Sequence, residues 1–429
     1  MSFVPIYILI LFLIILIDFF SVIAIEKSKG KQKRFYLIAS LLSNILLLCF
    51  FKYFNFLNDN IVYLFSLAGF QINPINLNIV LPIGLSFHTF QSMSYTIEVY
   101  RGKQKAERHL GYFANYVLFF PQMVAGPIER YETLGNELKA EKSLMYENFS
   151  AGFRLILFGL MVKMTIADNI APFVNEVYAN PLQHSSLKVF GAIVLFSFQI
   201  YADFYGYSTI ALGSARLLGI SIMTNFSTPY LAKSISEFWT RWHISLSTWF
   251  RDYVYISLGG NKVSLPKWSI NIMIVFLVSG LWHGASWTFV VWGALHGTVR
   301  LLEKYFSNLT GYKIKEGWSF VNVILTLKTF LITSFIWIFF RAENFEKVKD
   351  VLCALFQNVN IEFPTSNYLM PMLMSGFLVL LDISLYKTRF DFRLNELKTP
   401  GRWVIYAIFI FLLFAFSGTQ KFNFIYFQF

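Results

Sequence analysis

Long apolar stretches recur along most of the chain and are separated by short segments in which charged residues gather. A membrane-spanning α-helix needs roughly 20 predominantly apolar residues, because it must cross the hydrocarbon core of the bilayer. The pattern therefore predicts an all-α integral membrane protein with about 9–11 transmembrane helices. We place spans at residues 3–25, 35–56, 78–100, 150–170, 187–212, 270–298, 319–340, 368–386 and 402–418.

Three further apolar segments are too short or too polar to be simple spans, and we interpret them as re-entrant or interfacial: 61–70, 110–125 and 230–256. In the last of these, Phe238, Trp242, Leu246 and Trp249 follow one another at three- and four-residue spacing. This spacing predicts one apolar stripe along a helix. The 270–298 block is predicted to be either one bent helix or two.

Composition supports the membrane class. The 429 residues are 56% hydrophobic and only 14% charged, whereas soluble domains are about a quarter charged. We find no linker, repeat or low-complexity tract, so we expect a single membrane domain over residues 1–429. The two cysteines, Cys49 and Cys353, lie in apolar surroundings and predict neither a disulfide framework nor a thiol metal site.

The net charge of +12 does not indicate nucleic-acid binding, because the basic residues concentrate in short loops. Such loops orient membrane proteins with their positive side in the cytoplasm. The first apolar run is followed by lysines instead of a small-residue cleavage site, so we interpret it as a retained span. Placing the basic loops inside puts both ends of the chain, including the aromatic tail 419–429, outside. These loops are 26–34, 101–108, 213–267 and 387–402.

Two histidines, His243 and His283, lie in dense polar and aromatic runs within this apolar chain. Imidazoles near membrane depth are costly to charge, so they are functional candidates. A neutral imidazole at His283 can accept a proton from a hydroxyl group. The alternatives are an interfacial anchor with an incidental histidine at 243 and a packing histidine at 283. For His296, near a helix end, we favour a structural role.

Small and aromatic neighbours strengthen the candidate at 283. Gly280 and Gly284 flank it and allow another backbone or a substrate to approach closely, although they can equally serve to pack helices. Tryptophans at 282, 287 and 292 could form the wall of a tunnel. The sequence contains no HExxH, paired CxxC, phosphate-binding loop or nucleophile elbow, and no metal site is expected. Acid–base or acyl-transfer chemistry by histidine remains.

Four sequence motifs match a known family. They are SEFWTRWHISLSTWFRDYVYISLGGN from Ser236, SGLWHGASWTFVVWGALHG from Ser279, FFPQMVAGPIERY from Phe119 and FNFIYFQF from Phe422. With these motifs the chain resembles the membrane-bound O-acyltransferase (MBOAT) family. It is most similar to the bacterial branch of alginate and peptidoglycan O-acetyltransferase membrane subunits. The likeness extends from about residue 80 to the end, with a motif core at about 230–300.

The resemblance implies a helical fold around a central funnel in the bacterial cytoplasmic membrane. It implies that His283 is catalytic, with His243 as a second polar position, and that the chain is an acyltransferase without a bound cofactor. The expected donor is acetyl-CoA on the cytoplasmic side, and the expected acceptor is a cell-envelope or secreted polysaccharide. An exported SGNH-type transferase or esterase is the expected partner. Substrate-binding candidates are Arg241, Arg251, Trp242, Trp282 and Trp287.

Two further expectations concern the donor and the tail. A basic patch would bind the anionic part of the donor or, alternatively, would only set the topology; its members are Lys233, Arg241, Arg251, Lys262 and Lys267. Tyr426 in the tail would relay the acyl group outside the membrane, because a phenol ionises near pH 10 and its ester is activated. The alternative for the tail is an aromatic anchor at headgroup depth.

Three other functions remain open. The same basic patch could receive an acyl-carrier protein for D-alanyl transfer to teichoic acid. The chain could also be a transporter that moves a donor or glycan without chemistry, for which paired interrupted helices would be the sign. It could finally be a scaffold that recruits an exofacial transferase.

Overall fold

The computed structural model describes all residues except 1–6, 76, 78, 80, 81, 83, 124, 125, 144, 315, 358–365, 418–423 and 426–429. The described residues form helices and connecting segments and contain no β-strand. Seven helices are long and apolar enough to cross a membrane: Tyr7–Lys27, Gly30–Leu67, Tyr146–Ala179, Ser186–Leu217, Leu265–His283, Phe320–Arg341 and Thr399–Phe416. A shorter apolar helix covers Tyr368–Ser384. The all-α membrane class expected from the sequence is confirmed.

The chain divides into two compact units, which we describe separately. The first comprises residues 1–143 with 219–222, and the second comprises 144–218 with 223–429. Helices of the first unit are α1 (Tyr7–Lys27), α2 (Gly30–Leu48), α3 (Phe54–Leu67), α4 (Leu85–Tyr100), α5 (Leu110–Val117) and α6 (Asn136–Lys139). The expectation of a single domain over 1–429 stays a prediction.

A buried carboxylate joins the helices of the first unit. Asp18, fully buried on α1, accepts hydrogen bonds from Ser40 Oγ at 2.6 Å and from Asn44 Nδ2 at 2.9 and 3.0 Å, both on α2. Ser40 also contacts Thr96 Oγ1 on α4 at 3.2 Å. A carboxylate inside an apolar unit must be satisfied by such donors. The contacts therefore explain how a span can contain an aspartate.

The FFPQMVAGPIERY motif ends at a second carboxylate of the first unit. Tyr131 donates its hydroxyl to Glu107 at 2.6 Å, and Lys139 forms an ion pair with the same side chain. Burial alone would raise the pKa of Glu107, but the hydrogen bonds from Lys139, Tyr131 and a backbone N–H outweigh it and lower that pKa to about 2. Glu107 is therefore ionised at neutral pH and fixes the end of the motif.

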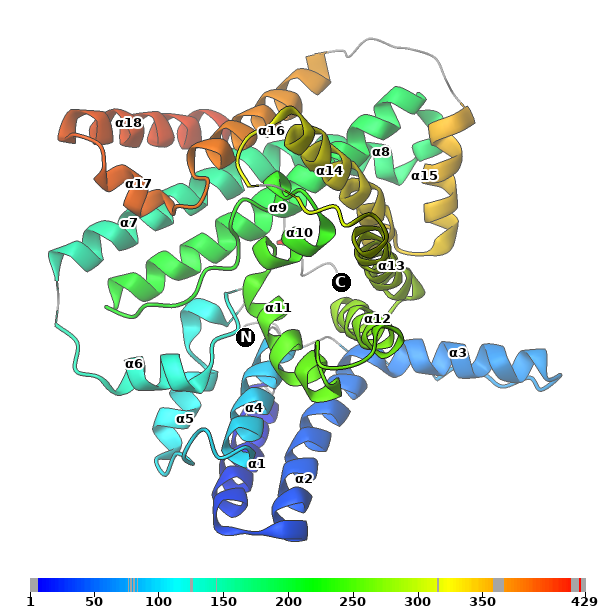
Figure 1. Cartoon of the computed structure of the whole chain (residues 1–429), viewed down its shortest axis with the longest axis vertical. Helices are drawn as coiled ribbons and strands as arrows, with labels where there is room; N and C mark the ends of the chain where they lie inside the picture. Colours follow the sequence, from blue (N-terminus) through cyan, green and yellow to red (C-terminus); the bar gives the residue numbers. More distant parts are fainter. Residues whose placement is uncertain are drawn as a thin grey trace. The chain divides into compact units, whose positions relative to one another are not determined.

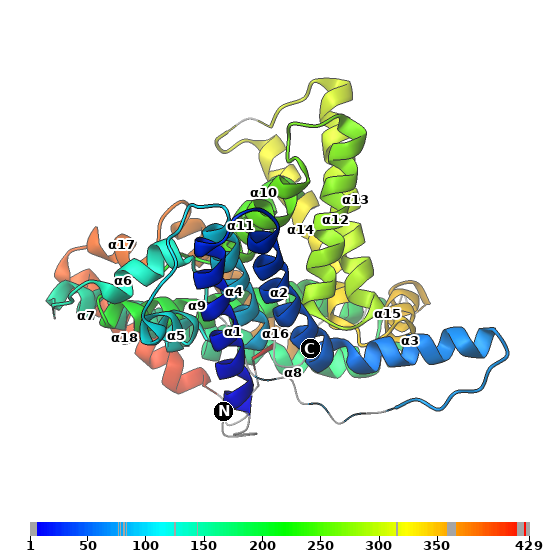
Figure 2. The ribbon, with the colours of Figure 1, turned by 90° about the horizontal axis from the view of Figure 1, so that it is seen from below.

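The second unit contains the motif core. Its helices are α7 (Tyr146–Leu160), α8 (Asp168–Ala179), α9 (Ser186–Leu217), α10 (Ile235–Arg241), α11 (Ile244–Phe250), α12 (Leu265–His283), α13 (Trp287–Thr310), α14 (Phe320–Arg341), α15 (Phe345–Gln357), α16 (Ser366–Ser384), α17 (Phe390–Asn395) and α18 (Thr399–Phe416). Helix α9 packs against α7, α8, α14, α15 and α16. The α12, α13 and α14 helices lie side by side (Figures 1 and 2).

The sequence left the 270–298 block open between one bent helix and two, and the structure has two. Helix α12 ends at His283, Gly284 is extended, and the Ser286 side chain accepts a hydrogen bond from Thr288 N at the start of α13. Serine is a favoured residue before a helix, because its oxygen satisfies one of the free N–H groups. His283 therefore stands at the end of a helix, beside a tight turn.

The motif glycines of α12 and α13 bring these two helices together. A Cβ atom on Gly280 would lie 2.3 Å from the Phe289 carbonyl oxygen, and one on Gly293 would lie 2.2 Å from the Phe276 carbonyl oxygen. A Cβ on Gly284 would lie 2.0 Å from the ring of Phe289. Contacts this short with backbone atoms favour the packing interpretation of Gly280 and Gly293 over space for a substrate.

We expect Gly293→Ala to destabilise the protein by about 1–3 kcal/mol, because the new methyl group would overpack the helix contact. Thermal unfolding of the purified protein in detergent measures this effect. Gly191→Ala on α9 is the matched control, since a Cβ atom at that position would have no other atom within 4 Å. Equal unfolding temperatures for the two variants would contradict the packing interpretation.

Candidate functional site

The first motif folds as two short helices and not as one amphipathic helix. Between α10 and α11, Trp242 is extended and His243 has a left-handed backbone, with φ of 42°. Ile244 N donates to the Asn225 carbonyl oxygen at 2.9 Å, and Ser227 N donates to the Arg241 carbonyl oxygen at 3.0 Å. The segment 225–227 thus takes the hydrogen bonds that a continuous helix would make. The prediction of one unbroken stripe was wrong at this break, although all four apolar residues are buried.

His243 is fully buried against aromatic rings. Its ring packs edge-on against Phe204 of α9 at a centroid distance of 4.8 Å and contacts Trp282 of α12 at 6.2 Å. It lies outside the seven spanning helices, and burial lowers the pKa of its imidazole to about 3. The side chain is therefore neutral at physiological pH and is a weaker base than a free imidazole. A non-glycine residue with positive φ is uncommon and marks places where function or packing holds strain.

His283 lies in the same cluster of aromatic side chains. It is 5% exposed and contacts Trp282 at 4.9 Å, Trp292 at 5.0 Å and Phe340 at 5.3 Å between ring centroids. Both His243 and His283 therefore contact one indole, that of Trp282. The two histidines, which lie forty positions apart in the sequence, are therefore separated by one aromatic side chain.

His296 also belongs to this cluster. It is fully buried, stacks on Phe238 and Phe276, and accepts a long hydrogen bond of 3.4 Å from Trp239 Nε1. Trp292 contacts both His283 and His296, at 5.0 Å in each case. His296 joins α10 to α13 through these rings, which agrees with the structural role favoured for it.

The remaining candidates are distributed between the core and the surface. Trp242 is 1% exposed and packs on Phe238 and Trp337, so it belongs to the core around the site. Trp287, at the start of α13, is 52% exposed and does not join the histidine cluster. Arg251 is exposed and pairs with Asp252 at 2.8 Å. The catalytic and binding roles proposed for all these residues stay predictions.

Arg241 is held by several partners at the end of α10. It pairs with Glu237 at 2.7 Å, donates to Thr228 Oγ1 at 3.1 Å and lies over the ring of Tyr386 at 5.1 Å. Ser234 precedes helix α10 and caps it, because its side chain accepts a hydrogen bond from Glu237 N at 3.1 Å. Arg241 is therefore largely neutralised and fixes Thr228 in place.

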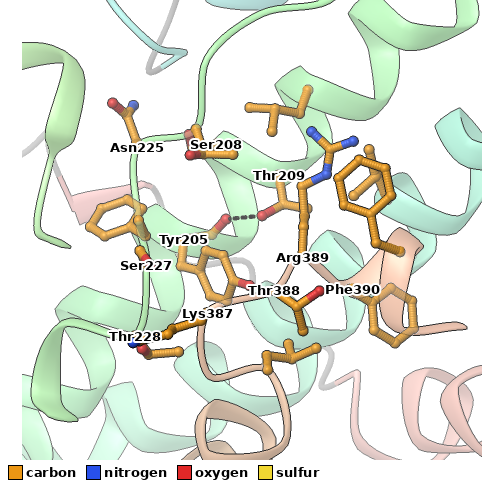
Figure 3. A pocket seen from close by; sticks show the side chains of 16 residues that line it. Tyr205, Ser208, Thr209, Asn225, Ser227, Thr228, Lys387, Thr388, Arg389 and Phe390 are labelled. Atoms are coloured by element: carbon orange, nitrogen blue, oxygen red, sulfur yellow. Dashed lines mark hydrogen bonds between the residues drawn. The ribbon is translucent and has the colours of Figure 1, made fainter. Parts of the chain in front are cut away.

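A cavity of about 300 Å³ lies next to this arrangement (Figure 3). Its wall combines hydroxyl, amide and cationic groups with apolar rings from α7, α9, α17 and two connecting segments. The lining residues are Leu155, Tyr205, Ser208, Thr209, Leu212, Thr224, Asn225, Phe226, Ser227, Thr228, Leu385, Lys387, Thr388, Arg389, Phe390 and Phe392. Arg389 makes two hydrogen bonds to Asp391, at 2.5 and 2.6 Å.

Two features make this cavity a candidate binding site. Within the described part of the chain, no hydrogen-bond partner contacts Asn225 Nδ2 or Ser208 Oγ, and both residues are at most 2% exposed. Buried polar groups are normally satisfied, so a ligand or water is expected there. Among the described non-glycine residues, those with positive φ are Thr228 and Lys387, which line the cavity, and His243.

The cavity lies close to His243. The Asn225 side-chain oxygen accepts a hydrogen bond from Ser245 Oγ at 2.6 Å, two residues after the histidine. Phe226, another lining residue, contacts Trp242 at 5.0 Å and Phe204 at 4.9 Å. Sequence reasoning missed this cavity, because the basic loop 387–402 gave only a topology signal and isolated residues such as Asn225 gave none.

Tyr426 lies outside the described residues, but the two preceding residues are placed. Phe424 packs against Tyr207 at 4.7 Å and Phe204 at 5.7 Å, and Ile425 N donates to Asp203 Oδ2 at 2.7 Å. Both tail residues are at most 4% exposed. The same Phe204 ring contacts His243, so this part of the tail is separated from the histidine by one side chain.

No three histidine, cysteine or acidic side chains of the described residues could hold a metal ion.

Comparison with known proteins places the motifs in a family. The model of the membrane-bound O-acyltransferase family matches residues 104–340, more than half of the chain. A probable alginate O-acetylase, AlgI, from Azotobacter vinelandii is 38% identical over 314 residues, which is 73% of this chain and 61% of that protein. A peptidoglycan O-acetyltransferase from Helicobacter pylori is 33% identical, covering 79% of this chain and 68% of that protein.

More distant similarity connects the chain to a teichoic acid D-alanyltransferase from Bacillus subtilis, 28% identical over 60% of this chain and 66% of that protein. The chain spans about three fifths of the length of the alginate relatives that it matches. The resemblance inferred from the motifs is confirmed.

Proposed function

Because this chain belongs to the membrane-bound O-acyltransferase family, we propose that it is the membrane subunit of a polysaccharide O-acetyltransferase. It moves acetyl groups from acetyl-CoA in the cytoplasm across the membrane to a cell-envelope or secreted polysaccharide. The observation that supports this proposal best is the pair of buried histidines on Trp282. The alginate and peptidoglycan O-acetylating relatives supply the substrate class.

The chemistry assigned to the site is acyl transfer with histidine as the base. His283 takes the proton of the acceptor hydroxyl, whose oxygen attacks the acetyl carbonyl carbon. The C–O bond forms, the C–S bond of the thioester breaks, and the leaving thiolate receives the proton from the imidazolium. His243 orients the donor or shares the proton, since a neutral buried imidazole can accept and donate a hydrogen bond.

The donor arm is assigned to the cavity beside Asn225. Phosphate groups need cations and hydrogen-bond donors, and the cavity offers Lys387, Arg389 and the free amide of Asn225. Of the basic patch expected from the sequence, Arg241 contacts the lining residue Thr228. Lys262 and Lys267 are exposed and do not line the cavity.

We expect Lys387→Asn to raise the KM for acetyl-CoA about threefold to tenfold, with little change in kcat, because the variant removes a cation near a phosphate. Asparagine tolerates the left-handed backbone that Lys387 adopts, with φ of 61°, so the fold should be retained. Lys398→Asn is the matched control in the same basic loop, since Lys398 precedes α18 and does not line the cavity. An unchanged KM for acetyl-CoA in Lys387→Asn would contradict the assignment of the donor to this cavity.

The acceptor side of the proposal involves the tail and a partner. Tyr426 receives the acetyl group and passes it to an exported SGNH-type transferase, which acetylates the polymer. This requires the tail to reach His283 and to face the exterior, with the basic loops in the cytoplasm of a bacterial cell. The placement of Phe424 beside Phe204 supports a tail that returns to the site instead of anchoring at the headgroups.

Release of free thiol from acetyl-CoA by the purified protein tests the function directly. Turnover with acetyl-CoA supports acetyl transfer. Turnover with a D-alanyl-loaded carrier protein, together with no response to acetyl-CoA, would support D-alanyl transfer instead, the activity named for the Bacillus subtilis relative. Polymer acetylation that survives loss of both histidines would leave the transporter or scaffold functions.

A further inference from the structure

A largely buried lysine lies between two carboxylates in the second unit. Lys163 Nζ is 2.5 Å from Asp168 Oδ1 and 2.7 Å from Asp203 Oδ1. Lys163 belongs to the π-helical turn Met161–Ala167 between α7 and α8, and Asp203 belongs to α9. Their side chains are 13% and 4% exposed. Lys163 therefore reaches α9 from a π-helical turn, a feature that is frequent at functional sites.

The two oxygens of Asp203 have different partners. Oδ1 forms an ion pair with Lys163, and Oδ2 accepts a hydrogen bond from the backbone N–H of Ile425 at 2.7 Å. The lysine therefore compensates the charge of a carboxylate whose other oxygen is used to hold the tail. A buried carboxylate is stabilised by a nearby cation and by hydrogen-bond donors. Removing either the lysine or the amide donor leaves part of its charge without a partner, which is costly in a buried site.

The anchored residues lie against the histidine side of the core. Phe424 contacts Tyr207 and Phe204, which follow Asp203 closely on α9. Phe204 in turn contacts His243 at 4.8 Å. A second contact lies before the tail, since Asn169 Nδ2 donates to the Phe416 carbonyl oxygen at the end of α18 at 2.8 Å.

We propose that Asp203 is a positioning residue, which Lys163 holds in place so that it anchors the tail at Ile425, beside the Phe204 ring that contacts His243. This inference rests on the proposed function, because it assigns a purpose to the tail in acyl transfer. Asp203 does not line the cavity assigned to the acyl donor, so the role proposed for it concerns the acceptor side only.

Two substitutions test the anchor from opposite sides. Asp203→Asn keeps the shape but replaces one acceptor oxygen with an NH₂ donor, so that either Lys163 or the Ile425 amide faces another donor. Ile425→Pro removes the amide hydrogen and leaves the ion pairs intact. Asp168→Asn and Ile425→Leu are the matched controls, since the first keeps the Lys163–Asp203 pair and the second keeps the N–H.

The rate of amide hydrogen exchange in the peptide that contains Ile425 measures whether the Ile425 N–H is protected by Asp203. This measurement does not depend on enzymatic activity. We expect exchange about tenfold faster or more in Asp203→Asn, because the Ile425 amide then faces either a donor or an uncharged and weaker acceptor, and wild-type exchange in Asp168→Asn. Unchanged exchange in Asp203→Asn would overturn the anchor. Because Ile425→Pro has no amide at 425, it is assessed by activity alone, so the idea stays testable if Asp203→Asn does not fold.

Steady-state kinetics test the positioning role. We expect a lower kcat with an unchanged KM for acetyl-CoA in Asp203→Asn and in Ile425→Pro, and wild-type kinetics in both controls. In a chain that lacks residues 424–429, Asp203→Asn should have no additional effect, since the two changes then act through the same segment. Faster exchange with wild-type kcat would overturn the positioning role. Failure of the wild-type protein to use acetyl-CoA would instead refute the proposed function, while the exchange experiment still tests the anchor.

Discussion

Replacing His283 with glutamine should reduce thiol release from acetyl-CoA by about 10²–10⁴-fold, because the acceptor hydroxyl loses its general base. Glutamine keeps a polar side chain of similar volume among Trp282, Trp292 and Phe340, so the cluster should remain packed. The measurement is thiol release by the purified variant, with its unfolding temperature recorded in parallel. His283→Ala should give a similar loss of activity with a larger loss of stability, since it leaves a cavity.

His296→Gln is the matched control for this prediction. His296 is buried against the same Trp292 ring, so the substitution removes an imidazole from the same aromatic surroundings. We expect it to lower the unfolding temperature and to leave most of the activity per folded molecule. A His283→Gln protein that inserts, folds and turns over like the wild type would show that His283 is not the general base.

Tyr426→Phe should reduce polymer acetylation in cells about 100-fold or more, since the variant keeps the ring but removes the hydroxyl that receives the acetyl group. Tyr426 follows Ile425, which Asp203 anchors beside the histidine side of the core. The measurement is the acetyl content of the purified polymer, with protein abundance checked in the same membranes.

Tyr207→Phe is the control for loss of a tyrosine hydroxyl near the tail. Its ring packs on Phe424 in either form, so tail packing should persist. We expect near-normal acetylation in this variant. Normal acetylation in Tyr426→Phe as well would contradict the relay hypothesis and favour the interpretation of the tail as an anchor.

The local sequence predicted the helices of the fold well. The length of an apolar run decides whether a helix can span a bilayer, and such runs placed α1, α9 and α14 near their observed bounds. The local sequence did not predict the break between α10 and α11. The spacing of Phe238 and Trp242 fits a continuous helix, but the hydrogen bond from Ile244 N goes to Asn225, which lies nineteen positions before it. Propensity and periodicity do not report such a competing partner.

In the candidate site, too, some features could be predicted from the local sequence and others could not. His243 and His283 could be selected as candidates because a histidine in an apolar run is unusual in any fold. The exposure of Trp287 could not be predicted, since a tryptophan after a helix turn has the same local pattern whether its ring faces the core or the bilayer. The cavity lined by Asn225 and Lys387 also had no local signal, because its residues come from segments about 160 positions apart.

The sequence by itself determined that this is a helical membrane protein with two candidate histidines and a family-specific set of motifs. Those properties depend on residue type and short spacing, which the unfolded chain already contains. Only the tertiary structure decided that both histidines meet Trp282, that Asp203 holds the amide of Ile425 and that Lys163 pairs with Asp203. Asp203 and Ile425 are 222 residues apart, and helix packing brings them together because a buried carboxylate without partners is costly.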